Sequence, residues 1–317
     1  KYTAIQRSVI NILSEGHLSP KAFNDNTSKE IHKEFIGNLD FNKQFFLLSD
    51  IEKLNFYQTK LDDEIILGRH NFFDLADSLI VQRIEESSVI YEELLAKPFD
   101  FSIDEKIETE YDKKEYAKDT LEIKELWRKY LKFQTLDMVL SLQDKEEKND
   151  TTPLKSFQEL EELAREKVKK GQDNWFRRLS QLTTNDRFSS YINSITAVFD
   201  PHTTYLPPKD KENFDIRFSG KLEGIGAVLR ETDGAIQVDR IVTGSASWKQ
   251  GELKVGDIIT KVAQVDEDAV DIQGMPLNDA VKLIRGPKGT EVRLTVKSKE
   301  DGVKIIPIIR DIVVLEE

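Results

Sequence analysis

The chain has 317 residues, of which 38% are hydrophobic and 33% charged, a composition typical of a globular protein of two or three domains. Its 46 basic and 58 acidic residues give a net charge of −12, which disfavours nucleic acid as a partner because phosphate binding needs basic surface. The absence of cysteine excludes disulfides, thiolate zinc sites and a cysteine nucleophile. The 4 scattered histidines predict no metal site, and no apolar run is long enough to span a membrane.

Residues 1 to about 200 predict a mainly α-helical domain, because apolar residues recur at spacings of three and four, as in Ile5, Val9 and Ile12. Two polar segments interrupt this pattern. Residues 98–118 are predicted to be irregular, and residues 143–152 to be a solvated loop. Capping boxes that would begin helices are expected at Thr27–Glu30, Ser49–Glu52 and Ser156–Glu159.

The helical pattern ends at a proline-rich stretch, which predicts a rigid connection over residues 199–213. Asp200 and His202 lie within it and suggest a catalytic pair. No serine or cysteine nucleophile motif accompanies them, however. The favoured interpretation is therefore that Asp200 caps a turn while His202 packs or faces solvent.

Beyond residue 214 the sequence predicts short strands with alternating apolar residues, and one short helix. The turn Thr232-Asp233-Gly234 is a hairpin signal between two of these strands. Gly286 is expected to end the helix. The strands are predicted over residues 228–231, 236–242, 258–262, 291–296 and 303–310, and the helix over residues 277–284.

The stretch Gly224-Ile225-Gly226-Ala227 is the one with a candidate chemical role. Its two glycines can leave backbone N–H groups uncovered, and consecutive N–H groups form an anion-binding nest. A nest beside a strand edge can hold the terminal carboxylate of a peptide that pairs with the strand. A simple hairpin corner remains an open alternative. A nucleotide loop is disfavoured because Leu229 stands where G-x-G-x-x-G needs glycine, and residues 286–290 lack the residue order of a P-loop.

The order of elements after residue 214 resembles the PDZ domain of C-terminal processing proteases. The match rests on residues 222–227 (LEGIGA), 244–246 (GSA), 255–259 (VGDII) and 283–290 (LIRGPKGT). Residues 200–206 (DPHTTYL) resemble the link that precedes this domain. The helical N-terminus is similar, in the order and spacing of residues 17–19 and 29–51, to that of the tail-specific proteases in this family.

This resemblance implies a multi-domain α + β chain. A helical domain would cover residues 1–198 and a linker residues 199–213. A PDZ domain, built as a partly open β-barrel or sandwich with short helices, would cover residues 214–311. Residues 312–317 would begin a protease domain. The family places a serine nucleophile and a lysine base in that following domain, so the chain is expected to be an inactive recognition and regulatory portion of a serine endopeptidase, with no catalytic residue, metal or cofactor of its own.

The resemblance also assigns site residues and partners. The N–H groups of Ile225, Gly226 and Ala227 would hold a substrate's terminal carboxylate, and residues 226–231 would pair with the peptide. Arg285 is the candidate regulatory residue. Ala227 stands where other PDZ domains often have a large apolar residue, which predicts a wider pocket. That side-chain pocket would be lined by Gly224, Leu229, Leu277, Val281 and Ile284.

The expected partners are the C-terminal tails of proteins and an adaptor protein. The expected location is the periplasm, with a signal peptide removed upstream. Two other functions stay open at this point. One is a non-catalytic PDZ scaffold or adaptor. The other is a chaperone-like helical cradle, which would bind unfolded chains whatever their C-terminus.

Overall fold

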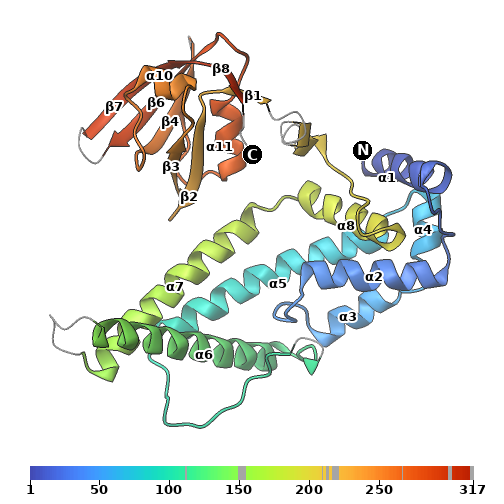
Figure 1. The fold of residues 1–317 in the computed structure, drawn as a ribbon. Helices are drawn as coiled ribbons and strands as arrows, with labels where there is room; N and C mark the ends of the chain where they lie inside the picture. The colour runs from blue at the N-terminus through green and yellow to red at the C-terminus, as the bar shows by residue number, and fades with distance from the viewer. Residues whose placement is uncertain are drawn as a thin grey trace. The chain divides into compact units, whose positions relative to one another are not determined.

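The computed structural model describes residues 1–110, 113–148, 155–208, 210–211, 214–215, 221–265, 267–298 and 302–314. The chain divides into two compact units, Lys1–Tyr205 and Leu206–Glu317. The first is helical, and the second contains a β-sheet with short helices (Figure 1). The predicted α + β organisation is therefore confirmed.

The helical unit contains three long helices, α5, α6 and α7, which pack on one another (Figure 1). Helix α2 packs against α8 and α4, and α3 and α8 also contact α5. The first helix continues into a short π-helix, η1. The bounds are α1 (Tyr2–Asn11), η1 (Ile12–Gly16), α2 (Asp25–Leu39), α3 (Leu48–Asn55), α4 (Leu61–Leu67), α5 (Asn71–Leu95), α6 (Thr120–Glu147), α7 (Phe157–Gln181) and α8 (Thr184–Phe199).

Aromatic side chains form the centre of this unit. Phe35 of α2 lies 5.8 Å from Phe72 of α5 and 5.2 Å from Tyr191 of α8, measured between ring centroids. All three rings are buried. A second cluster includes Trp127 of α6, whose indole N–H donates to the carbonyl of Gln44 at 3.0 Å. The apolar series in the sequence therefore form a core, as helical periodicity predicts.

Of the helix starts predicted from capping boxes, the structure confirms one and places two elsewhere. Ser156 caps α7 as predicted, with Glu159 completing the capping box. Helix α2 instead begins after Asn24, whose extended backbone lets its side chain accept from the amides of residues 26 and 27. Helix α3 begins after Leu47, whose amide donates to Asp50 at 3.1 Å. The expected boxes at Thr27 and Ser49 are wrong because both residues lie inside their helices, and the N-cap amides of Asn24 and Leu47 donate to Thr27 and Asp50.

The two polar segments behave differently. The described residues of segment 98–118 form no α-helix or named strand. Residues 143–147 belong to α6, so the loop predicted there is wrong. Long charged and amide side chains favour a helix, and pairs four residues apart, such as Asp144 with Lys148 at 2.7 Å, support it on the solvent side. Residues 149–152 lie outside the described residues.

The stretch after α8 is fixed to the helical unit. The amide of Tyr205 donates to Asn193 Oδ1 at 2.7 Å, and Asn193 Nδ2 donates back to the carbonyl of Tyr205 at 3.1 Å. The amide of His202 donates to Asp200 Oδ1 at 2.7 Å. Asp200 therefore stabilises a turn and His202 is exposed, which confirms the structural interpretation of this pair.

The second unit is built on an antiparallel sheet of six strands, ordered β2-β3-β4-β6-β7, with β5 paired to β4. Strands β1 and β8 form a separate two-stranded ribbon, in which Gly224 pairs with Asp311. Among the described residues the sheet does not close into a barrel. The bounds are β1 (Lys221–Gly224), β2 (Ala227–Thr232), β3 (Ala235–Ile241), β4 (Ile258–Gln264), β5 (Val270–Asp271), β6 (Glu291–Ser298), β7 (Gly302–Ile309) and β8 (Asp311–Val314).

Alternation along the strands sets the core of this unit. Val292, Leu294 and Val296 of β6 are buried, whereas Arg293 between them and Lys297 after them are exposed. The hairpin between β2 and β3 turns at residues 233–234, both with positive φ. This geometry matches the right-handed twist of the strands, which explains the hairpin signal in the sequence.

Helices α10 (Ala246–Gln250) and α11 (Leu277–Ile284) contact this sheet. The predicted bounds of α11 are confirmed, but the role predicted for Gly286 is wrong. The helix already ends at Arg285, which is extended with φ −68° and ψ 164°, and Gly286 is not in the left-handed region. Glycine is needed at residue 286 for a different reason, because the side chain of Arg310 occupies the space that a Cβ would fill.

Candidate functional site

The glycine stretch Gly224–Ala227 forms a loop between β1 and β2, called the 224–227 loop below. Gly226 has φ +74°, a conformation that favours glycine. A Cβ at this residue would also lie 2.1 Å from the Cβ of Ser245 and 3.2 Å from a methyl of Val313. Glycine is therefore required here by both conformation and space.

Hydrogen bonds hold the carbonyl groups of this loop. The carbonyl of Ile225 accepts from the amide of Ser247 at 2.8 Å. The carbonyl of Gly226 accepts from the amide of Val242 at 2.9 Å and from the hydroxyl of Ser245 at 3.1 Å. Between described residues, the amides of Ile225 and Gly226 donate to no other residue. Hydrogen bonds to its carbonyl groups thus hold the loop in place. The amides of Ile225 and Gly226 have no acceptor in the described part of the chain.

Strand β2 continues directly from this loop and is the edge strand of the sheet. It pairs with β3 on one side, and no described strand pairs with its other edge. Helix α11 lies beside β2 (Figure 1). The loop, an open strand edge and a helix therefore come together, as the sequence analysis expects for peptide capture.

The predicted pocket residues differ in their exposure. Leu229 of β2 and Leu277 and Val281 of α11 are half-buried. Gly224 and Ile284 are buried, and Ile284 belongs to the core of the unit. Of the three residues predicted to hold a carboxylate, Ile225 and Gly226 are buried and Ala227 is half-buried. Ile225 and Ile284 belong to the core of the unit, Ala227, Leu229 and Leu277 pack against it, and α11 contacts β2.

Arg285 lies at the end of α11. It is half-buried, and a Cβ at Gly224 would lie 3.7 Å from its Cγ and 3.9 Å from its Cα. Its aliphatic stem therefore packs beside the first residue of the 224–227 loop. Arg285 thus lies where α11 meets the 224–227 loop, and its regulatory role stays a prediction.

Sequence reasoning missed three residues of this region. Ala280 of α11 is fully buried, and its small side chain gave no signal. Ser245 lies in a stretch predicted only as a turn, yet it caps α10 and binds the carbonyl of Gly226. Arg310 is also buried, in phase with Ile306 and Ile308. Its position on the inward face of an alternating strand was the signal that would have identified it.

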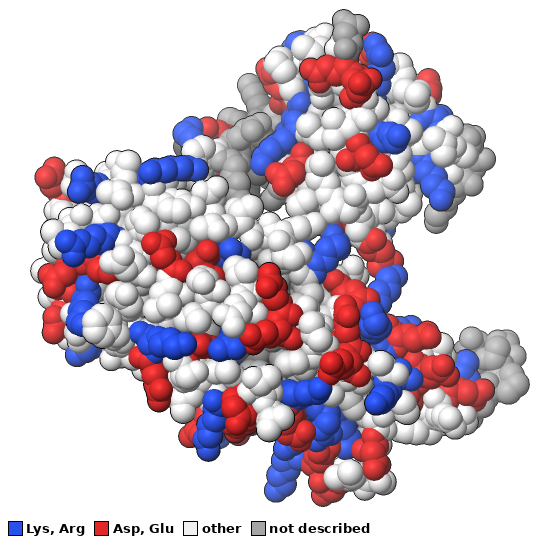
Figure 2. Space-filling view, turned by 180° about the vertical axis from the view of Figure 1, so that it is seen from behind, with Lys and Arg blue, Asp and Glu red and all other residues white. Residues whose placement is uncertain are grey.

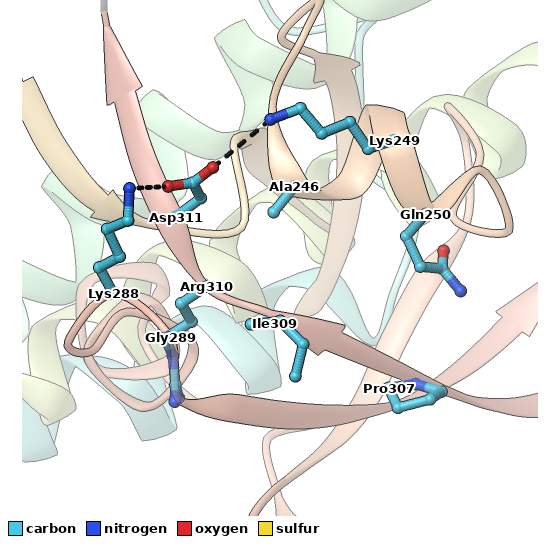
Figure 3. A pocket seen from close by; sticks show the side chains of 9 residues that line it. All are labelled: Ala246, Lys249, Gln250, Lys288, Gly289, Pro307, Ile309, Arg310 and Asp311. Atoms are coloured by element: carbon cyan, nitrogen blue, oxygen red, sulfur yellow. Dashed lines mark hydrogen bonds and ion pairs between the residues drawn. The ribbon is translucent and has the colours of Figure 1, made fainter.

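Charged side chains surround the ribbon formed by β1 and β8. Asp311 lies 2.8 Å from Lys288 Nζ and 3.4 Å from Lys249 Nζ (Figure 3). Lys288, by its hydrogen bond above all, lowers the pKa of Asp311 to about 2. These residues line a pocket of about 540 Å³ together with Ala246, Gln250, Gly289, Pro307, Ile309 and Arg310.

Acidic and basic side chains are interspersed over the face shown in Figure 2. Within the described residues, no three His, Asp or Glu side chains are grouped as metal ligands. In the same part of the chain, no helix combines the length and the apolar character that crossing a bilayer requires.

Comparison with known families identifies the relatives of this chain. The model described as tail specific protease N-terminal domain matches residues 9–209, well over half of the chain. This chain belongs to the tail-specific protease family. A second model, the PDZ domain, matches residues 215–297 of this family member. The PDZ domain predicted from the order of strands is confirmed.

Individual relatives also support the assignment of this chain to the tail-specific protease family. The tail-specific protease of Haemophilus influenzae is 32% identical over 308 residues, which are 96% of this chain and 42% of that protein. The carboxy-terminal processing protease CtpA of Bacillus subtilis is 37% identical over 122 residues, 38% of this chain and 25% of the relative. The chain therefore spans less than half the length of these curated relatives.

A solved PDZ domain is also similar. It comes from a carboxy-terminal protease of Vibrio cholerae in complex with peptide, and it is 41% identical. The similarity covers 29% of this chain and 97% of the solved domain, with a TM-score of 0.28.

Proposed function

We propose that the PDZ domain of this chain binds the free C-terminus of a polypeptide. The observation that carries the proposal is the pair of amides at Ile225 and Gly226, which lie beside the open edge of β2 and have no described partner. Together with the amide of Ala227 they would donate to the terminal carboxylate. Each such charge-assisted hydrogen bond contributes roughly 1.5–3 kcal/mol.

The peptide backbone would then pair with β2 over residues 226–231, in the space next to α11. Leu229, Leu277 and Val281, which keep part of their surface exposed, would contact the last side chain of the ligand. The buried Gly224 and Ile284 would form the base of this pocket. Because the contact involves a few residues only, we expect micromolar affinity, about 8 kcal/mol.

We propose further that the parent protein is a serine endopeptidase with a serine nucleophile and a lysine base in a domain after the PDZ domain. Family membership and the greater length of the relatives support this. The described chain would then select substrates by their C-terminal tails, and cleavage would occur elsewhere in the parent. The 317-residue chain alone is expected to cleave no unfolded substrate; cleavage that a serine-directed inhibitor blocks would contradict this.

The family resemblance also carries two narrower proposals, the periplasm as the location and an adaptor protein as a second partner. Fractionation of cells that express the tagged parent protein tests the first. Crosslinking in intact cells, followed by identification of captured proteins, tests the second. Recovery of the parent in the cytosol only would contradict the periplasmic location.

Peptide binding is tested by fluorescence polarisation with an apolar-ended peptide and its C-terminal amide. We expect the acid to bind at least about tenfold tighter, because the amide loses charge-assisted bonds. Equal affinities would refute the carboxylate site. A scaffold without a protease domain would give the same binding, so the sequence of the parent beyond residue 317 decides that alternative. A chaperone-like cradle would bind both peptides alike.

A matched pair of variants locates the site. Gly226→Ala forces a side chain against Ser245 and should abolish binding. Gly302→Ala, at the start of β7 on the opposite edge of the sheet, also places alanine at positive φ (+72°), but its Cβ meets no atom within 4 Å. It should therefore bear the same conformational strain and bind the peptide normally. Equal loss in both variants would mean that general destabilisation explains the result.

A further inference from the structure

Arg310, which follows β7, is a buried arginine with 3% of its surface exposed. It has five N–H donors, and five hydrogen bonds use them. Every acceptor is an uncharged oxygen. The partners are the carbonyls of Ile284 (2.9 Å), Leu283 (3.2 Å) and Glu291 (3.3 Å), Thr290 Oγ1 (2.8 Å) and Gln264 Oε1 (2.6 Å).

Two of these acceptors are the last carbonyls of α11. The C-terminus of a helix carries partial negative charge, so it favours a cation at this position. Burial lowers the pKa of Arg310, yet an arginine remains charged in proteins. The end of α11 and the guanidinium therefore stabilise each other, and the helix is held at Leu283 and Ile284.

Gly286 provides the space for this arrangement. A Cβ at residue 286 would lie 2.9 Å from the Cζ of Arg310 and 3.0 Å from its Nε. The main chain of Arg310 is also fixed, since its amide donates to the carbonyl of Thr290 and its carbonyl accepts from the amide of Gly289, both at 2.8 Å. Arg310 thus joins the loop after α11 to the start of β8 through its main chain.

Arg310 consequently lies between the two sides of the proposed peptide site. On one side its guanidinium holds α11, which carries Leu277 and Val281. On the other side its main chain leads directly into β8, whose first residue, Asp311, pairs with Gly224. Gly224 begins the 224–227 loop. The separation between the loop and α11 is therefore set through Arg310.

We propose that Arg310 is a positioning residue that determines which terminal side chain the PDZ domain accepts. It does so by fixing α11 relative to the 224–227 loop, without contacting the ligand. This inference rests on the proposed function, because it requires that a peptide C-terminus binds between these two elements.

The experiment measures the affinities of four peptides that differ only in the last residue, Ala, Val, Leu or Phe. The wild-type chain should rank them, because a pocket of fixed width discriminates by size. In Arg310→Gln the ratio between the tightest and weakest peptide should fall by at least about threefold, since α11 is then free to adjust. Hydrogen exchange at the amides of Leu283 and Ile284 should become faster in the same variant.

Two further variants keep the test decisive. Ile308→Val removes one methyl from the same buried face, two residues before Arg310, so it weakens the core but leaves the hydrogen bonds from Arg310 to α11 in place. It should keep the wild-type ratio. Gly286→Ala retains the arginine but displaces it, so it should reduce the ratio as Arg310→Gln does, and it replaces that variant if Arg310→Gln fails to fold.

The outcomes separate the two proposals. A wild-type chain that binds a peptide acid and its amide equally overturns the proposed function and this inference with it. Carboxylate-dependent binding with an unchanged ratio in a folded Arg310→Gln or Gly286→Ala overturns the role of Arg310 alone. A reduced ratio in Ile308→Val as well would mean that any loss of stability reduces selectivity, which also overturns it.

Discussion

The carboxylate of Asp311 and the ammonium of Lys288 are 2.8 Å apart, and they join β8 to the loop that follows α11. The amide of Lys288 also donates to Glu223 of β1 at 3.0 Å. Both strands of the ribbon are thereby attached to the segment that ends the helix. These contacts are on the surface, so they contribute to geometry more than to stability.

The ion pair predicts a specific titration. The pKa of Asp311 is lowered from 3.8 to about 2, with the hydrogen bond from Lys288 as the largest cause. Lys288→Met should raise this pKa clearly, whereas Lys249→Met, which removes the weaker contact at 3.4 Å, should raise it less. Carboxyl ¹³C chemical shifts against pH measure both. A larger effect from Lys249→Met would reverse the assignment.

The lowered pKa of Asp311 also determines how the stability of the PDZ domain depends on pH. The folded pKa of Asp311 lies below the ordinary value, so the ion pair stabilises the PDZ domain above about pH 4. This contribution is lost as the pH falls towards 2. Asp311→Asn should therefore unfold at a slightly lower temperature than wild type at pH 7, and this difference should disappear in acid.

Ser245 connects the loop geometry to α10. Its hydroxyl donates to the carbonyl of Gly226, and it caps the helix. Ser245→Ala should cost about 1 kcal/mol of stability and weaken peptide binding several-fold, because the carbonyl of Gly226 in the 224–227 loop loses one of its two donors. Ser156→Ala removes a comparable cap from α7, and it should leave peptide affinity unchanged. Isothermal titration of both variants makes the comparison.

His32 predicts an acid sensitivity in the helical domain. Its ring lies in the core, 3.1 Å from the carbonyl of Leu54, and burial lowers its pKa below 6.5. The neutral form is favoured in the folded state, so stability should fall as the pH drops below 6.5, by up to about 1.4 kcal/mol per pH unit.

A histidine control isolates this effect. His32→Gln removes the titrating ring and keeps a donor for Leu54, so urea unfolding between pH 5 and pH 8 should show a flatter dependence. His202→Gln changes an exposed residue and should keep the wild-type curve. Identical curves for all three proteins would contradict the prediction.

A buried ion pair holds α3 on α5. Both carboxylate oxygens of Asp50 accept from Arg83, at 2.7 Å and 3.1 Å, and the aspartate side chain is fully buried. Asp50→Asn should cost about 3 kcal/mol, because the guanidinium loses its buried counter-charge and keeps only Glu86, which is partly exposed. Lys53, with 58% of its side chain exposed, lies 3.7 Å from Asp50, so Lys53→Met should change stability by less than about 0.5 kcal/mol. Calorimetry of the helical transition measures both.

Much of the fold could be predicted because it depends on local pattern. The bounds of α11 follow from apolar residues on one face, and the β2–β3 hairpin follows from an Asp-Gly turn. Helix starts were less predictable, because several acceptors near Asn24 and Thr27 compete for the same free amides. The polar end of α6 was missed since solvated helices and loops share a composition.

The residues of the candidate site also differ in how well the sequence predicts them. The 224–227 loop was visible in the sequence because its glycines are close together. Arg310 was not, because its role depends on partners up to 46 residues away in the chain, among them Gln264 and Ile284. Spacing along a sequence does not show which carbonyls a folded helix presents to a distant side chain.

The ribbon of β1 and β8 has a mechanical consequence. Lys221 pairs with Val314, so the chain enters and leaves this pairing at the same end. A force that pulled the flanking segments apart would break the ribbon one residue pair at a time, starting at this end, before it loaded β2, β3 or the sheet core. The PDZ domain would thus tolerate tension on its connections, because the ribbon would open before the sheet and would pair again once the tension is released.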